Sequence, residues 1–160
     1  MTELSTIAPA FVDMAHRIVW ATVATVDRND SPRTRVLHPI WEWNGTSLTG
    51  WIATTPQSPK ATDLAHNNMV SLTYWDPSQD VATAECATSW ITDDQGRHQA
   101  WERFANAPEP VGYDPSMIPT WTDPDAEAFG VLELTPQRLR VFPGTLLLAG
   151  QGELLTWRQA

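Results

Sequence analysis

Two short segments in the first half of the chain gather basic side chains in a protein that has few of them. Residues 31–41 read SPRTRVLHPIW and hold Arg33 and Arg35, and residues 58–64 read SPKATDL and hold Lys60. One guanidinium group can donate two parallel hydrogen bonds to two phosphate oxygens, and a lysine adds a compact positive charge. We therefore expect the two segments to form a phosphate site, and a phosphate indicates a nucleotide-like cofactor.

The first segment is expected to place both arginines on one face of a strand. Side chains alternate between the two faces of a strand, so Arg33 and Arg35 share a face and His38 lies on the other. Two guanidinium groups on one face repel each other unless water or an anion screens them. The alternative is a solvated strand face whose arginines pair with acidic residues such as Glu85 across the sheet.

The second segment has the pattern of a helix start. Ser58 is a favourable N-cap residue, Pro59 suits the first helical position, and Lys60 then falls in the first turn. Free N–H groups and the helix dipole attract anions to this end. Thr54 and Thr55, just before it, can supply hydroxyl groups. The alternative is an ordinary helix start with an exposed lysine.

Other types of site find little support in the sequence. His38 is a candidate cofactor neighbour or proton relay, with a satisfied core or interface histidine as the alternative. No Cys, His and carboxylate spacing indicates a metal site, so none is predicted. The nucleophile elbow, the Walker loop and the Gly-x-Gly-x-x-Gly pattern are absent. No catalytic acid, base or nucleophile stands out, and Cys86 is expected to be a buried, inert thiol.

Composition limits the classes of partner. The chain has 160 residues and a formal net charge of -9, from 19 acidic and 10 basic residues. We expect one domain, residues 1–160, without nucleic-acid or membrane partners, which would require a basic surface. The N-terminus shows no signal peptide, no apolar run is long enough for a membrane span, and one cysteine permits no intrachain disulfide. A cytoplasmic protein is therefore predicted.

Hydrophobic periodicity and turn residues predict a mainly β (α+β) protein. Asn44-Gly45 indicates a hairpin, so the first three strands are expected to form an antiparallel meander. The expected strands are 19–27, 33–43, 47–53, 70–75, 81–92, 129–134, 139–142, 146–149 and 154–157. The expected helices are 9–17, 58–66 and 97–106, and 107–127 is an ordered irregular loop. We predict a split β-barrel of about six to eight mostly antiparallel strands with two or three short helices.

Three stretches resemble one protein family in their order and spacing. They read IVWATVATVDRNDSPRTRVLHPIW, WNGTSLTGWIATTPQSPK and KATDLAHNNMVSLTYW, and they fall within residues 11–75. This part of the chain resembles the pyridoxamine 5′-phosphate oxidase-like family, the FMN-binding split barrels. The resemblance implies a homodimer with two cofactor sites at the subunit interface. It also implies these cofactor contacts: Arg35 and Lys60 at the phosphate, with Arg33 as a possible third contact; Val36, Leu37 and His38 at the ring edge; and Thr54, Thr55 and Ser58 before the helix.

Departures from the oxidase pattern change the expected activity. Pro59 stands where the oxidase has a basic residue, and Ile40 stands where it has a lysine. Its C-terminal Arg-x-His element is absent, because Arg158 is followed by Gln and Ala. Oxidation of pyridoxamine 5′-phosphate is therefore the least favoured reading. The Ser-Pro-Lys form resembles branches that bind FMN or the deazaflavin coenzyme F-420.

The resemblance thus implies a flavin-type oxidoreductase. It would bind FMN or coenzyme F-420 at a homodimer interface and transfer hydride to or from a small organic substrate. The alternative is a non-catalytic flavin-binding carrier or redox sensor. Tyr113 and Trp121 in the loop 107–127 are expected either to form a lid over a planar substrate or to plug a barrel end.

Overall fold

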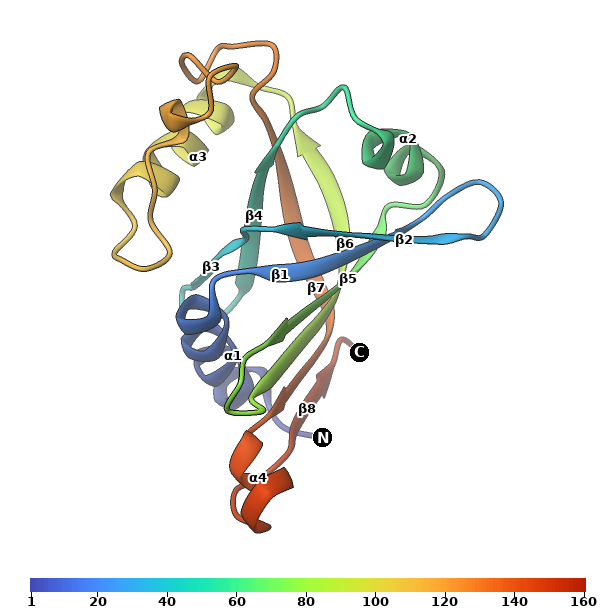
Figure 1. The fold of residues 1–160 in the computed structure, drawn as a ribbon, viewed down its shortest axis with the longest axis vertical. Coiled ribbons are helices and arrows are strands. Elements are labelled where there is room, and N and C mark those ends of the chain that lie inside the picture. The colour runs from blue at the N-terminus through green and yellow to red at the C-terminus, as the bar shows by residue number, and fades with distance from the viewer.

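A computed structural model describes all 160 residues and consists mainly of one antiparallel sheet (Figure 1). The sheet has eight strands in the order β2-β1-β5-β6-β7-β4-β3, and β8 pairs with β7. The strands are β1 Ala21–Val26, β2 Pro32–Leu37, β3 Ile40–Trp43, β4 Leu48–Thr54, β5 Met69–Trp75, β6 Val81–Ile91, β7 Gly130–Phe142 and β8 Leu155–Arg158. The helices are α1 Leu4–Ile18, α2 Pro59–His66, α3 Asp94–Asn106 and α4 Gly144–Ala149, with a 3-10 turn, η1, at Pro115–Met117.

The fold class is as predicted, mainly β with few helices. The two edge strands of the sheet, β2 and β3, follow each other in the chain, but they do not pair with each other, so the hydrogen-bonded sheet is open. No helix of the structure is both long enough and apolar enough to cross a membrane.

The expected strand over residues 33–43 is broken in two. β2 ends at Leu37 and β3 begins at Ile40, with His38 and Pro39 between them. Pro39 has no N–H to donate to a ladder, and its ring restricts the residue before it. β2 pairs with β1 and β3 pairs with β4, so the predicted three-strand meander does not form. The bend instead places His38 where the chain passes from one sheet edge to the other.

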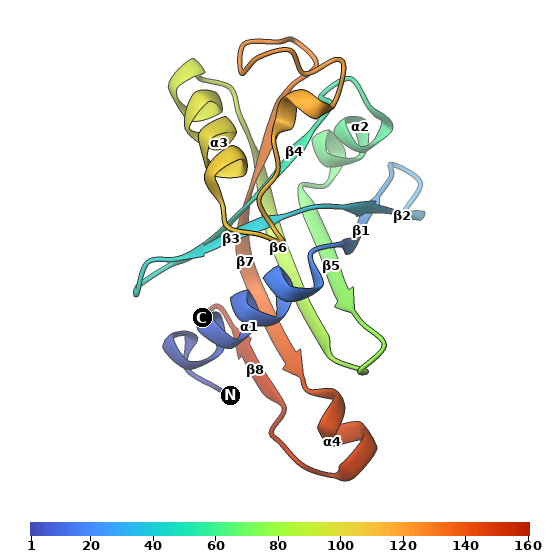
Figure 2. The same cartoon turned by 60° about the vertical axis from the view of Figure 1, so that its left-hand side comes forward.

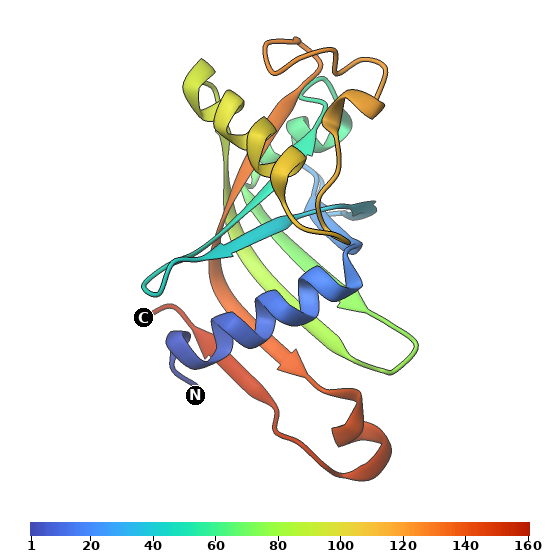
Figure 3. The same cartoon turned by 90° about the vertical axis from the view of Figure 1, so that its left-hand side faces the viewer.

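Helix α1 lies across the strands on one face of the sheet (Figures 2 and 3). Ile7, Phe11 and Ala15 recur at helical spacing, and all are buried in the larger hydrophobic cluster with residues of β5, β6 and β7. The helix begins at Leu4 rather than near residue 9, so Pro9 lies inside it and not at its first position.

Strand β4 separates two hydrophobic clusters. Its residues alternate between them: Leu48 and Ile52 belong to the cluster under α1, and Trp51 and Ala53 belong to the other. The second cluster lies beneath α3 and the loop 107–127, which sit together beside the upper end of β4 in Figure 1. β4 therefore connects the sheet core to the part of the molecule that carries the loop.

The C-terminal third differs from expectation in two elements. The expected strands 129–134 and 139–142 are one strand, β7, which passes through Pro136 opposite a register shift in β6 between Glu85 and Cys86. The expected strand 146–149 is helix α4, because Gly150 adopts a left-handed conformation (φ 65°) and its N–H bonds back to the Leu146 carbonyl. With α4, the structure has four α-helices rather than two or three.

Candidate functional site

A large cavity lies between the first β-hairpin, the start of α2 and the loop 107–127. Its volume is about 1010 Å³. The wall is formed by the C-terminal end of α1, the end of β2, the end of β4 with the segment leading to α2, and residues of the loop. Of the nine predicted cofactor contacts, these lie on its wall: Val36, Leu37, His38, Thr54, Thr55, Ser58 and Lys60. Residues from both basic segments therefore meet at one cavity.

One end of the cavity is polar and cationic. The Lys60 ammonium group donates a hydrogen bond to the Ser58 hydroxyl at 2.8 Å. Ser58 is the N-cap residue of α2, with Pro59 at the first helical position as predicted, although its side chain makes no capping hydrogen bond. Burial, and then the nearby Arg35 guanidinium, lower the pKa of Lys60. The two cations therefore lie close enough to repel each other.

Arg35 lies behind this end and not on the cavity wall. Its Nη1 donates to the Thr25 hydroxyl at 2.8 Å and to the carbonyls of Val23 and Arg33 at 3.2 Å and 2.9 Å. Its Nη2 lies 3.6 Å from the buried Asp63 carboxylate, which also accepts a 2.7 Å bond from Thr25. Burial lowers the pKa of Arg35, while Asp63 acts in the opposite direction. The guanidinium is thus fixed by its own protein partners.

Arg33 also lies outside the cavity wall. It contacts Asp27 through Nη2 at 2.9 Å and Nε at 3.1 Å, and both line a separate hollow of about 330 Å³. The Asp27 carboxylate accepts the backbone N–H groups of Asn29 and Ser31, and these bonds lower its pKa more than Arg33 does. The partner considered from the sequence, Glu85, pairs with Arg138 instead. The two arginines therefore do pair with acidic residues, but Arg33 pairs with Asp27 and Arg35 with Asp63.

Another part of the cavity wall is aromatic. The His38 ring lies between Trp20 and Tyr113, with ring centroids 5.0 Å and 4.8 Å away. Its Nε2 is buried without a hydrogen-bond partner, and the same is true of Nε1 of Trp121, which also lines the cavity. Burial lowers the pKa of His38, so the imidazole is neutral at neutral pH. Buried polar atoms without partners are rare in proteins, and here two belong to one cavity.

The loop 107–127 covers this aromatic part and is held against α3. Arg97 donates to the Ala126 carbonyl at 2.8 Å, and His98 Nε2 lies 2.6 Å from Asp125. Trp121 is buried, whereas Met117 is 71% exposed. Tyr113 and Trp121, the two loop residues expected to form a lid or a plug, therefore both line the cavity.

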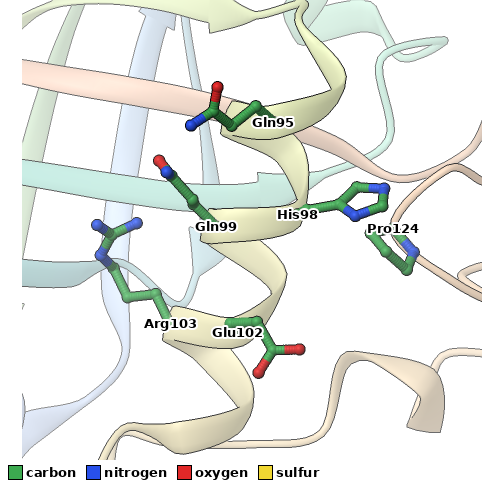
Figure 4. A pocket seen from close by; sticks show the side chains of 6 residues that line it. All are labelled: Gln95, His98, Gln99, Glu102, Arg103 and Pro124. Carbon is green, nitrogen blue, oxygen red and sulfur yellow. The ribbon is translucent and has the colours of Figure 1, made fainter.

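Another hollow, on the outer surface of α3, lacks the features of a site (Figure 4). In the figure, Gln95, Gln99 and Arg103 point to one side of the helix, and His98 points to the other, toward Pro124. Arg103 lies over the Trp51 ring, 3.7 Å from its centroid. The side chains do not converge on one point. The structure also holds no group of three or more His, Cys, Asp or Glu residues that could bind a metal ion.

Sequence reasoning missed three contributors to the site. Val19 and Trp20 line the cavity just after the end of α1. In the sequence they are only an apolar pair between a helix and a strand, and this pattern does not indicate a site. Asp63, read only as part of a helix, contacts Arg35. That contact depends on how α2 packs against β1 and β2, and no local pattern indicates it.

The fold and the cavity define a small antiparallel-sheet protein whose cavity wall holds a lysine, hydroxyl groups and aromatic side chains. The sequence profile of the family described as Pyridoxamine 5'-phosphate oxidase matches residues 7–142. The chain therefore belongs to that family. A comparison with curated proteins finds no match.

Solved structures of the same fold are similar over nearly the whole chain. A pyridoxamine 5'-phosphate oxidase-related, FMN binding protein from Nostoc punctiforme has a TM-score of 0.68 at 15% identity, covering 100% of this chain and 98% of that one. A protein from Clostridium acetobutylicum related to general stress protein 26 has a TM-score of 0.67 at 13% identity, with 97% and 94% covered. An F-420 reductase has a TM-score of 0.53 at 13% identity, with 78% and 90% covered. At these identities the likeness concerns the fold.

Proposed function

We propose that this protein is an oxidoreductase that binds FMN or the deazaflavin coenzyme F-420 in the cavity and transfers hydride to or from a small organic substrate. One observation carries the proposal: a single cavity is lined both by Lys60 with hydroxyl groups and by the aromatic group of Trp20, His38 and Tyr113. An FMN binding protein and an F-420 reductase among the structures of similar fold support it.

The wall residues fit a cofactor with a phosphate tail and a planar ring. Lys60 with Ser58 would hold the phosphate, as a charged donor beside a hydroxyl group. Val36 and Leu37, which also line the cavity, would face the ring edge, and the unpartnered Nε2 of His38 would gain a polar neighbour. The volume of about 1010 Å³ is at the upper end of the range for small-molecule sites, which leaves room for a substrate beside the cofactor.

When bound, such a cofactor supplies the hydride chemistry, and the protein supplies binding, orientation and exclusion of water. The apolar side chains of Ile18, Val36 and Ile118 line the cavity and keep water from the ring. His38 is neutral because burial lowers its pKa, so it can serve as a hydrogen-bonding group without adding a charge. The loop 107–127 would act as the lid over the substrate, with Tyr113 and Trp121 on its inner side.

We also propose that the working form is a cytoplasmic homodimer with the cofactor at the interface. Trp20 and Val36 line the cavity yet are 58% and 61% exposed, so part of the wall is open to a partner. A second copy would cover this apolar rim and complete the pocket. The oligomeric state of the protein therefore tests this part of the proposal.

Spectroscopic titration with each cofactor, followed by a turnover assay, tests the proposed function. We expect FMN or coenzyme F-420 to bind with a change in absorption or fluorescence, and the reduced cofactor to be reoxidised by members of a quinone and enone panel. If neither cofactor binds at micromolar concentrations, the proposal is wrong. Binding without turnover would favour the non-catalytic carrier or redox sensor. Formation of pyridoxal phosphate from pyridoxamine phosphate is not expected.

A further inference from the structure

Beside the cavity wall, outside its lining, lie two ion pairs formed by the two predicted arginines. Arg35 lies 3.6 Å from the Asp63 carboxylate, and Arg33 lies 2.9 Å from Asp27. Lys60 makes no ion pair and bonds only to the Ser58 hydroxyl. Each arginine therefore has its own carboxylate, and one cation remains for a ligand.

Asp63 is held in place independently of any ligand. It is 6% exposed, and it accepts a 2.7 Å hydrogen bond from the Thr25 hydroxyl. Thr25, 1% exposed, accepts in turn from Arg35 at 2.8 Å. This chain from Arg35 through Thr25 to Asp63 fixes the carboxylate beside the Arg35 guanidinium, so Asp63 balances the charge of Arg35. A buried charge of this kind is screened little by solvent and acts on a neighbouring ligand more strongly than a surface charge.

Because one cation remains free, the binding of a phosphate depends on how many negative charges the phosphate carries. A phosphate monoester, such as that of FMN, carries about -1.5 to -2 at neutral pH because its second pKa is about 6. A phosphodiester carries a single charge. Lys60 can balance one charge, but a second would face Asp63 without a free cation, in a protein whose net charge is already -9.

We infer that Asp63 is a specificity-determining residue that makes this site select a singly charged phosphodiester over a doubly charged phosphate monoester. The inference rests on the proposed function, because it concerns the phosphate tail of the same cofactor. Asp63 does not touch the ligand in this account. It acts through Arg35 and through its own charge.

Two ligands that differ by one charge test the inference directly. FMN and its monomethyl phosphate ester share the ring and the ribityl chain, so fluorescence titrations compare the charge alone. We expect the wild type to bind the ester at least as tightly as FMN at neutral pH and low salt. Tighter binding of FMN than of the ester by the wild type would overturn the inference while leaving the proposed function intact. Binding of neither flavin, nor of coenzyme F-420, would overturn both.

The variant Asp63→Asn keeps the size and the hydrogen-bonding oxygen but removes the charge. The ratio of affinities should shift toward FMN by about tenfold, the effect of one unit charge at partly screened close range. Asp27→Asn is the matched control, because Asp27 pairs with Arg33 rather than with Arg35, and its ratio should equal that of the wild type. An unchanged ratio in Asp63→Asn, or an equal shift in Asp27→Asn, would contradict the inference. The wild-type comparison needs no variant, and a wild-type preference for FMN overturns the inference even if Asp63→Asn does not fold.

Discussion

Lys60 is the cation that the protein leaves available at its cavity, while the two arginines are held by other groups. Replacing it by glutamine keeps a donor at similar length but removes the charge. A charged hydrogen bond is worth about 1.5–3 kcal/mol, so Lys60→Gln should weaken binding of FMN or coenzyme F-420 about tenfold to a hundredfold. Titration by absorption or fluorescence measures the change.

The matched variant is Arg33→Gln, which removes the same charge from a residue that faces Asp27 rather than the cavity. Its cofactor affinity should stay close to that of the wild type. Equal losses in both variants would indicate a general charge effect, and the assignment of Lys60 to the phosphate would then be wrong.

His16 supplies a pH dependence of stability. Its Nε2 accepts a hydrogen bond from the Trp41 backbone N–H at 2.9 Å, so only the neutral ring fits there. Burial lowers the pKa of His16 below its ordinary 6.5, so below that pH the unfolded chain binds a proton that the folded chain does not. Stability should therefore be complete above about 6.5 and fall as pH decreases below it. His38, whose pKa burial also lowers, acts in the same direction.

Urea unfolding across this pH range tests the role of His16. His16→Gln retains an acceptor for the Trp41 N–H but cannot titrate, so its stability should depend less on pH than that of the wild type. His66→Gln, at an exposed histidine at the end of α2, is the control and should give the wild-type profile. If the His16→Gln profile matched that of the wild type, the pH dependence would have another source.

At the residue scale, local patterns predicted the wall of the site but not what lies behind it. Val36 and Leu37 end β2, His38 follows them directly, and Lys60 follows a Ser-Pro helix start, so the basic segments and the family resemblance were enough to find them. Asp63 contacts Arg35 and Thr25 because α2 packs against the first hairpin. The partner of a charged side chain depends on such tertiary contacts, and many acids were available to each arginine.

Among the elements, the end of α1 carries a strained turn at the cavity. Val19 has φ 74° and ψ -59°, and the Trp20 N–H bonds back to the Ile18 carbonyl at 2.9 Å. This is a γ-turn of the rare handedness, and positive φ is especially unfavourable for a β-branched residue. Val19 and Trp20 both line the cavity. Strain of this kind is often found at functional sites, which agrees with the position of the turn.

The strain at Val19 can be measured by comparing two substitutions. Val19→Ala removes most of the buried side chain but keeps a Cβ at positive φ, whereas Val19→Gly also removes the Cβ. Glycine should therefore be more stable than alanine here by about 1 kcal/mol, the reverse of the order in regular helices and strands. Urea unfolding of both variants gives the difference. If Val19→Ala were the more stable of the two, the turn would not be strained.

Elements with long, regular patterns were predicted well, and those that depend on one turn residue were not. The expected strand 33–43 is broken at Pro39, while β7 continues through Pro136, because the second proline falls at an irregularity in the pairing with β6. The helix expected over 97–106 begins earlier, because residues 93–96 are the N-cap and first turn of α3, where Asp93 accepts the Gly96 N–H at 2.7 Å. The same residue types favour turns and helix starts, so the sequence could not separate them.

At the scale of the whole molecule, exposed apolar side chains surround the mouth of the cavity. Trp20, Val36 and Met117 all line it, and they are 58%, 61% and 71% exposed. Exposed apolar groups at one site indicate an interface, and a second copy of the chain is the partner that the proposed homodimer requires. Leu147 and Leu148 are also exposed, but they lie on α4 at the opposite end of the molecule in Figure 1. The two regions can therefore be tested separately.

Sedimentation of Val36→Glu tests whether the cavity rim is the dimer interface. A glutamate there would be buried without a partner in the dimer, which costs about 3 kcal/mol or more and should raise the dimer dissociation constant at least about a hundredfold. The variant should sediment as a monomer at concentrations where the wild type is a dimer. Leu148→Glu makes the same change on α4 and should remain dimeric, because that end of the molecule lies outside the proposed interface. A wild-type monomer with full cofactor affinity would place the complete site within one chain, and dissociation by Leu148→Glu alone would move the interface to α4.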